Sequence, residues 1–151
     1  MHQRFQVVPA AYVILRRCDE VLMQLRQGTG YRDGYWACGI AGHVEAGESV
    51  LQAAVREAVE EAGVVIEPAD LRPLTTLHRT HGNGLAIDER VDFFFTCERW
   101  RGDPHLVERH RSALMGWFDI TALPAPVVPH EARVLTGLRT GDLPAILPFG
   151  F

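Results

Sequence analysis

The sequence lacks any long hydrophobic segment. Hydrophobic residues make up 47% of the 151-residue chain, but no stretch approaches the roughly 20 consecutive apolar residues that a membrane-spanning helix needs. The first ten residues, MHQRFQVVPA, also lack the basic start, apolar stretch and small-residue cleavage site of a secretory signal. We therefore expect a soluble, cytoplasmic protein that does not contact a membrane.

An excess of positive charge and a set of paired cysteines are missing as well. The formal net charge is −4, which disfavours binding to polymeric nucleic acid but not to a small anion held through metal ions. The three cysteines, Cys18, Cys38 and Cys97, show neither CxxC nor Cys/His metal spacing. An odd number without such spacing fits ordinary thiols in a reduced compartment better than a disulfide framework.

No repeat, charge block or low-complexity linker divides the chain, so we expect a single domain over residues 1–151. Short apolar, β-branched or aromatic runs bounded by turn residues predict strands. These runs cover residues 10–15, 20–25, 71–78, 90–97 and 113–118. The first two should form a hairpin with a turn at 16–19, and the glycines of 27–34 predict a loop.

Two segments have the composition and ends of helices. Ser49 to Ala62 is rich in helix formers and precedes Gly63, and His130 to Arg139 has apolar residues at helical spacing before Gly141. Helices mixed with strands in this order predict an α/β (α+β) domain in which helices cover a mixed sheet. The apolar tail from Leu143 to Phe151 should dock on this body, or on a partner subunit.

The first predicted helix has two different faces. One stripe of apolar residues, centred near Leu51, should be buried; its members are Leu51, Ala54, Val55, Ala58 and Ala62. Three carboxylates share another side, because positions three and four apart are neighbours on a helix; they are Glu57, Glu60 and Glu61. This crowding is typical either of a solvated acidic face or of a site for a divalent cation, since hard cations prefer carboxylate oxygens.

The surrounding pattern favours the metal site. The segment from Gly42 to Val64, GHVEAGESVLQAAVREAVEEAGV, resembles the Nudix box, G-x5-E-x7-R-E-U-x-E-E-x-G-U with U an apolar residue, and meets every fixed position. By this resemblance the chain is identified as a member of the Nudix (MutT-like) hydrolase family. The resemblance implies the Nudix fold, a mixed β-sheet sandwiched between α-helices.

The resemblance also implies roles for individual residues. Metal ions, Mg²⁺ or possibly Mn²⁺, would be held by Glu57 and Glu61 as principal ligands, Glu60 as an auxiliary ligand and the backbone carbonyl of Ala41. Glu48 would accept hydrogen bonds from Arg56 and fix the loop to the helix. The ions would neutralise charge on the phosphate oxygens and activate water for attack at phosphorus.

The general base remains open between two residues. Glu57 lies within the box, and Glu108 lies in the polar loop before the strand at 113–118. His105 and His110 share that loop and are either phosphate or base contacts or ordinary surface histidines. Glu108 has the same alternative, because a charged residue in a polar loop is often only solvated.

The approach to the box departs from the family pattern. The segment from Trp36 to Gly42 lacks the usual proline and paired glycine and has one extra residue, which Gly39 would absorb as a bulge. This departure puts the Ala41 carbonyl ligand in doubt.

Aromatic and basic residues supply candidates for substrate contacts. Stacking on a base or pairing with phosphate is possible for Tyr31, Tyr35, Trp36, Arg32, Arg79 and Arg90. The alternative for the aromatic residues is packing in the core or sheet. We expect hydrolysis of a diphosphate linkage in a small nucleotide, such as a nucleoside triphosphate, a nucleotide sugar or ADP-ribose. A catalytically weak nucleotide-binding or regulatory module is the alternative, and a homodimer is possible.

Overall fold

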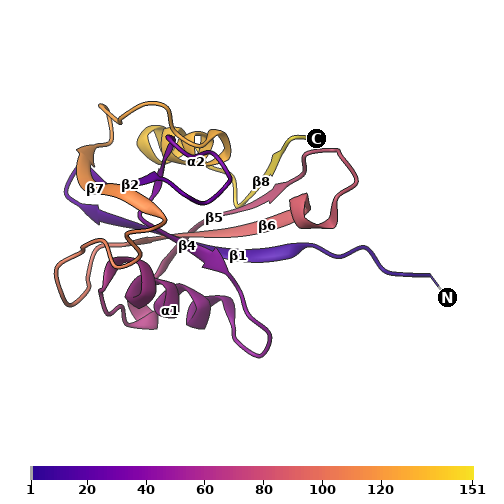
Figure 1. Ribbon diagram of the computed structural model, residues 1–151, viewed down its shortest axis with the longest axis horizontal. Helices are drawn as coiled ribbons and strands as arrows, with labels where there is room; N and C mark the ends of the chain where they lie inside the picture. Colours follow the sequence, from indigo (N-terminus) through magenta and orange to yellow (C-terminus); the bar gives the residue numbers. More distant parts are fainter. Residues whose placement is uncertain (1) are drawn as a thin grey trace.

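The computed structural model describes residues 2–151 and consists of a mixed sheet with one α-helix on each side (Figure 1). The helices are α1 (Val50–Ala62) and α2 (Pro129–Thr140), with short 3-10 turns at Pro68–Asp70 and Ala86–Asp88. The strands are β1 (Val8–Arg17), β2 (Glu20–Arg26), β3 (Trp36–Cys38), β4 (Ile40–His43), β5 (Arg72–Arg79), β6 (Arg90–Cys97), β7 (Ser112–Asp119) and β8 (Ile146–Phe149).

Strand β1 is the centre of the sheet. The order is β3-β2-β1-β6-β5-β8, with β4 paired to β1 and β7 paired to β2. The β1·β6 and β5·β8 pairs are parallel and the others are antiparallel. The mixed sheet predicted from the sequence is therefore confirmed.

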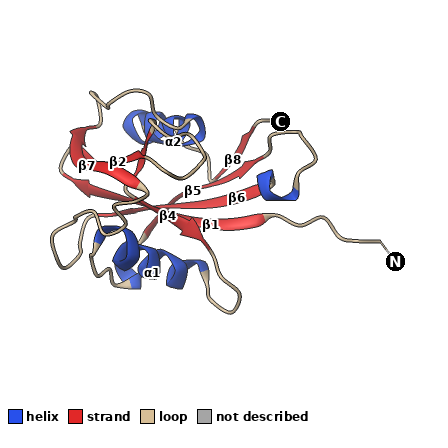
Figure 2. Ribbon diagram, in the orientation of Figure 1, coloured by secondary structure: helices blue, strands red, loops and turns tan. Residues whose placement is uncertain are grey.

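Both faces of β1 are buried, which explains its continuous apolar sequence. Alternate side chains of a strand point to opposite faces. Ala11, Val13 and Leu15 belong to the core cluster under α1, whereas Ala10, Tyr12 and Ile14 belong to the cluster that includes Val134 and Leu135 of α2. Figure 2 shows the two helices on opposite sides of the sheet.

The predicted elements are confirmed with small shifts of their ends. The β1–β2 hairpin is present, but its turn is shorter than predicted, because Arg16 and Arg17 pair with Val21 and Glu20. The C-terminal tail forms β8 against β5, with Leu147 buried and Phe151 exposed. None of the helices within residues 2–151 has the length and apolar character to cross a membrane.

Strands β3 and β4 were not predicted, and they explain the unusual approach to the box. β3 pairs with β2, and one residue later β4 pairs with β1. Gly39 makes this change of partner at a bend, and its N–H donates to the Leu22 carbonyl at 3.2 Å. A Cβ at Gly39 would lie 2.8 Å from Cδ2 of Leu22. A side chain at this crossing would therefore have to displace the buried Leu22 side chain.

The ends of α1 follow the predicted capping. Ser49 forms a capping box with Gln52, and Gly63 ends the helix with φ 66°. The predicted buried stripe, however, is wrong in its centre. Leu51 is 40% exposed and Val55 is half-buried, whereas Ala54, Ala58 and Ala62 are buried as predicted. Ala53 and Glu57 are buried with them. The small alanine side chains let the helix approach β1 and β4 closely, which turns Glu57 inward.

Candidate active site

Two helix glutamates lie against strand β4. Around a Cβ built at Gly42, the nearest atoms all belong to the Glu57 carboxylate, with Oε2 at 2.6 Å. One residue earlier, the Ala41 N–H donates to Oε2 of Glu61 at 2.6 Å. The absence of a side chain at Gly42 therefore makes room for Glu57, and the backbone beside it holds Glu61.

Arg56 joins the box loop to the helix. Its Nε and Nη2 donate to both oxygens of Glu48 at 3.1 and 2.7 Å, and Nη2 also donates to the His43 carbonyl at 3.0 Å. Its Nη1 donates to Glu57 at 2.7 Å and to Glu60 at 3.1 Å. The contact between Glu48 and Arg56 that the resemblance implies is present. One guanidinium thus orders three of the box carboxylates.

The box carboxylates differ in their environment. The two hydrogen bonds from Arg56 hold the pKa of Glu48 below its usual range. Burial raises the pKa of Glu57 although Arg56 opposes the shift, and burial raises the pKa of Glu61 well above its ordinary value. Glu57 and Glu61 are therefore carboxylates whose charge lacks full compensation in the protein.

Glu108 lies near these two carboxylates. Its charge raises the pKa of both Glu57 and Glu61 further. The loop from β6 to β7 that carries it is attached to the end of α1, because the His105 N–H donates to the Ala62 carbonyl at 3.1 Å.

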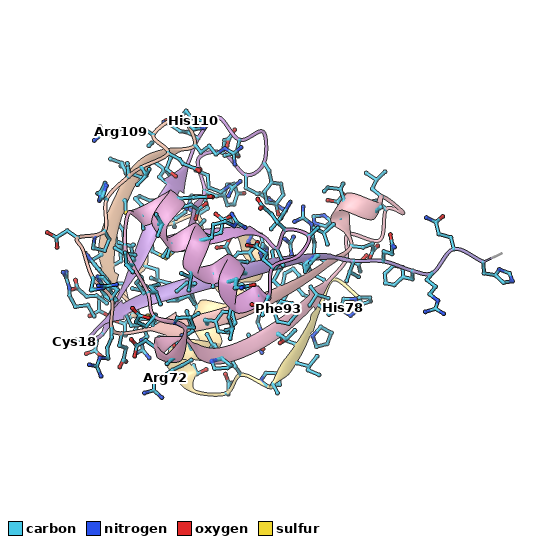
Figure 3. All side chains as sticks on the ribbon, turned by 90° about the horizontal axis from the view of Figure 1, so that it is seen from below. Cys18, Arg72, His78, Phe93, Arg109 and His110 are labelled. Carbon is cyan, nitrogen blue, oxygen red and sulfur yellow. The ribbon has the colours of Figure 1, made fainter. Side chains whose placement is uncertain are left out.

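At its other side, this loop contacts the β2–β3 loop. Gln27 donates from its backbone N–H to the Arg111 carbonyl and from Nε2 to the Arg109 carbonyl, both at 2.9 Å. Figure 3 labels Arg109 and His110 at the outer end of the loop. The His105 imidazole packs over Gly63, which favours a structural role for this histidine, whereas it is the backbone carbonyl of His110 that approaches Gly28.

The residues present fit a divalent cation. Glu57, Glu61 and Glu108 destabilise one another's charges, and a bound cation would reverse that repulsion. Among the described residues 2–151, no three His, Cys, Asp or Glu side chains lie close enough together to hold one ion by themselves. Backbone carbonyl, water and phosphate oxygens would therefore have to complete the coordination, as Mg²⁺ commonly allows. Glu60 is the exposed one among the three predicted carboxylate ligands.

A cavity of about 330 Å³ opens beside Glu61 and Glu108. Its volume is within the range of small-molecule sites. The walls come from strands β1 to β7, the end of α1, the start of α2 and the two long loops. The predicted residues Tyr31, Arg79 and Arg90 line it, as do Ala41 and Gly42.

Other predicted substrate contacts lie elsewhere. Trp36 packs edge-on against Phe118, with ring centroids 5.0 Å apart, and is outside the lining of the cavity. Packing is therefore its role in this structure. Arg32 lies with its guanidinium 5.2 Å from the centre of the Tyr35 ring and lines a neighbouring cavity instead.

Several lining residues escaped the sequence analysis. Arg26, at the end of β2, donates to the Tyr31 carbonyl at 2.9 Å and to Oγ1 of Thr29 at 3.1 Å. Glu131, in the first turn of α2, accepts a hydrogen bond from the Cys38 N–H at 2.8 Å, and burial raises its pKa to about 7. The position of Arg26 directly before a glycine-rich loop was the available indication. For Glu131, the only indication was that a carboxylate lies in an otherwise apolar stripe of the predicted helix.

Comparison with known proteins shows which family this chain is similar to. Residues 7–138 match the family model of the NUDIX domain. The NAD-capped RNA hydrolase NudC of Citrobacter koseri is 39% identical over 71 residues, which are 47% of this chain and 26% of that protein. The matched region thus spans about a quarter of the length of the curated relatives.

Solved structures have the same fold over most of the chain. The crystal structure of a MutT NUDIX hydrolase from Burkholderia pseudomallei has a TM-score of 0.77 and 26% identity, and the match covers 87% of this chain and 97% of that one. A NUDIX hydrolase from Nitrosomonas europaea has a TM-score of 0.75 at 19% identity, with 98% and 80% coverage. Since the family match extends over most of the sequence, the chain belongs to the NUDIX family.

Proposed function

We propose that this protein is a Mg²⁺-dependent hydrolase of a diphosphate linkage in a nucleoside diphosphate joined to another group. The observation that carries the proposal is a pair of enclosed carboxylates beside strand β4. Glu61 lines a cavity that arginines also line, and Glu57 lies against Gly42 in the wall of the same cavity. NUDIX hydrolases generally use divalent metal ions, and the raised pKa values of this pair are those of carboxylates that gain from a bound cation.

Different residues of the chain would bind the cation, position the box loop and contact the phosphate. Glu57, Glu61 and the Ala41 carbonyl would hold the cation, with Glu60 as an outer ligand. When bound, the cation supplies charge neutralisation at the phosphate oxygens. Arg56 and Glu48 would keep the box loop against the helix through their two hydrogen bonds. Arg26, Arg90 and Arg111 line the same cavity and would contact phosphate.

Glu108 is the better placed of the two candidates for the general base. Glu57 accepts a hydrogen bond from Arg56 at 2.7 Å and is assigned to the cation, so its oxygens are already engaged. Glu108 lines the cavity and has no charged partner within 4.0 Å among residues 2–151. It is therefore free to accept the proton of an attacking water.

The decisive experiment is hydrolysis of a panel of nucleoside triphosphates, nucleotide sugars and dinucleotides with Mg²⁺ or with EDTA. Wild type should hydrolyse at least one member only with metal, and Glu61→Gln should lower kcat at least 100-fold. Glu98→Gln, an exposed carboxylate outside the cavity, is the matched control and should keep full activity. Tight binding without hydrolysis of any member would instead support a nucleotide-binding module. A cytoplasmic location and a homodimer stay predictions.

A further inference from the structure

A second cavity lies directly beside the first. It has a volume of about 180 Å³ and shares Tyr31, Arg79 and His130 with the larger cavity. The two cavities thus adjoin at these shared side chains. A ligand of the first that also occupies the second would pass beside Tyr31, Arg79 or His130.

The lining of the second cavity is suited to an anion. It consists of Tyr31, Arg32, Arg79, Thr80, His81, Pro129, His130 and Phe149. Among these described residues there is no Asp or Glu, although the chain as a whole is acidic. Burial lowers the pKa of His130 to about 2, so the imidazole is neutral. The positive charge comes from Arg32 and from Arg79, whose charge is partly compensated by Asp92 behind the lining.

Arg79 is oriented toward both cavities by a buried carboxylate. Its Nε donates to Oδ2 of Asp92 at 2.6 Å. Both residues are buried, with Arg79 7% and Asp92 0% exposed. This is the only hydrogen bond of the Arg79 side chain within residues 2–151. The terminal Nη groups therefore remain available as a pair of donors at the shared wall. A planar pair of donors matches two oxygens of a phosphate.

We propose that the second cavity binds a phosphate monoester carried by the substrate in addition to the diphosphate that is cleaved. Arg79, positioned by Asp92, and Arg32 donate to it, while Tyr31 and Phe149 contact the sugar or ring that bears it. This inference rests on the proposed function and narrows its substrate class. Substrates with a third phosphate group outside the diphosphate should be preferred over the same molecules without it.

The test uses pairs of diphosphate compounds that differ by one phosphate monoester: NADPH against NADH, and coenzyme A against dephospho-coenzyme A. With wild type, kcat/KM should be at least about tenfold higher for the phosphorylated member of one pair, because a charged hydrogen-bonded contact contributes about that much. Arg79→Gln and Arg32→Gln should each reduce this preference several-fold. Arg99→Gln, an exposed arginine outside both cavities, should leave it unchanged.

The outcomes separate this inference from the proposed function. Equal kcat/KM within both pairs, or a preference that survives both variants, would overturn the phosphate site even if hydrolysis is rapid. Dissociation constants of the same compounds, measured by calorimetry with EDTA, provide a readout that does not need catalysis and should show the same preference. Arg79→Gln removes the partner of buried Asp92 and lowers stability, so exposed Arg32 carries the test alone if that variant does not fold.

Discussion

Two adjacent buried residues of α2 should give the protein opposite pH dependences of stability that nearly cancel. Burial lowers the pKa of His130 from 6.5 to about 2, and burial raises that of Glu131 from 4.5 to about 7. Each neutral side chain keeps a partner, since His130 lies 3.1 Å from the Tyr12 hydroxyl and Glu131 accepts from the Cys38 N–H. Replacing either one should expose the pH dependence of the other.

The signs and sizes follow from proton linkage. The folded state binds a proton at Glu131 more tightly than the unfolded chain does, so this stability is present below pH 4.5 and is lost as pH rises toward 7. The folded state resists protonation of His130, so that stability is present above pH 6.5 and is lost as pH falls. Between pH 4.5 and 6.5 each contribution changes by about 2 kcal/mol, in opposite directions.

The assay is urea unfolding followed by tryptophan fluorescence at pH 4.5, 5.5 and 6.5. Relative to wild type, Glu131→Gln should lose about 2 kcal/mol more stability on going from pH 6.5 to 4.5, because only the His130 contribution remains. His130→Gln should gain about the same amount over that change. Glutamine preserves a hydrogen-bonding group at each position. Parallel pH profiles for all three proteins would refute the argument from burial.

Two glycines at the box support further predictions. Gly42→Ala should lower metal-dependent kcat at least tenfold, since the new Cβ would displace the Glu57 carboxylate; steady-state rates would show it, and unchanged kcat would mean that the carboxylate is not held there. Gly63→Ala should destabilise the fold by about 2 kcal/mol and by more than Gly47→Ala. Both glycines have positive φ, but only at Gly63 would the Cβ meet another side chain, that of His105. Urea unfolding midpoints compare the two, and equal losses would contradict this account.

The sequence predicted those parts of the site that lie close together along the chain. Ser49, Gly63 and the three glutamates of α1 follow from capping rules and from a contiguous motif. The alanines Ala54, Ala58 and Ala62 of its buried face were predicted as well, but Leu51 was wrongly placed at the centre, because hydrophobicity ranks leucine above alanine while the small side chains are the ones that pack on the sheet.

The rest of the cavity depends on contacts between distant segments. Tyr12, Arg26 and Glu131 meet only because β1 and β2 pair and α2 packs on the sheet more than 100 residues after β1. Strands β3 and β4 were missed because three and four residues are too short to show alternation. Such long-range placement cannot be read from local patterns.

The change of strand partner at Gly39 fixes the number of residues between β3 and β4 ahead of the box. Cys38 is fixed in register opposite Met23, and Ile40 opposite Val13. An inserted or deleted residue between them would turn β4 over and point the Ala41 N–H away from Glu61. The hydrogen bond that holds Glu61 of α1 therefore depends on the number of residues between Cys38 and Ile40, so this short connection should not tolerate a change in length.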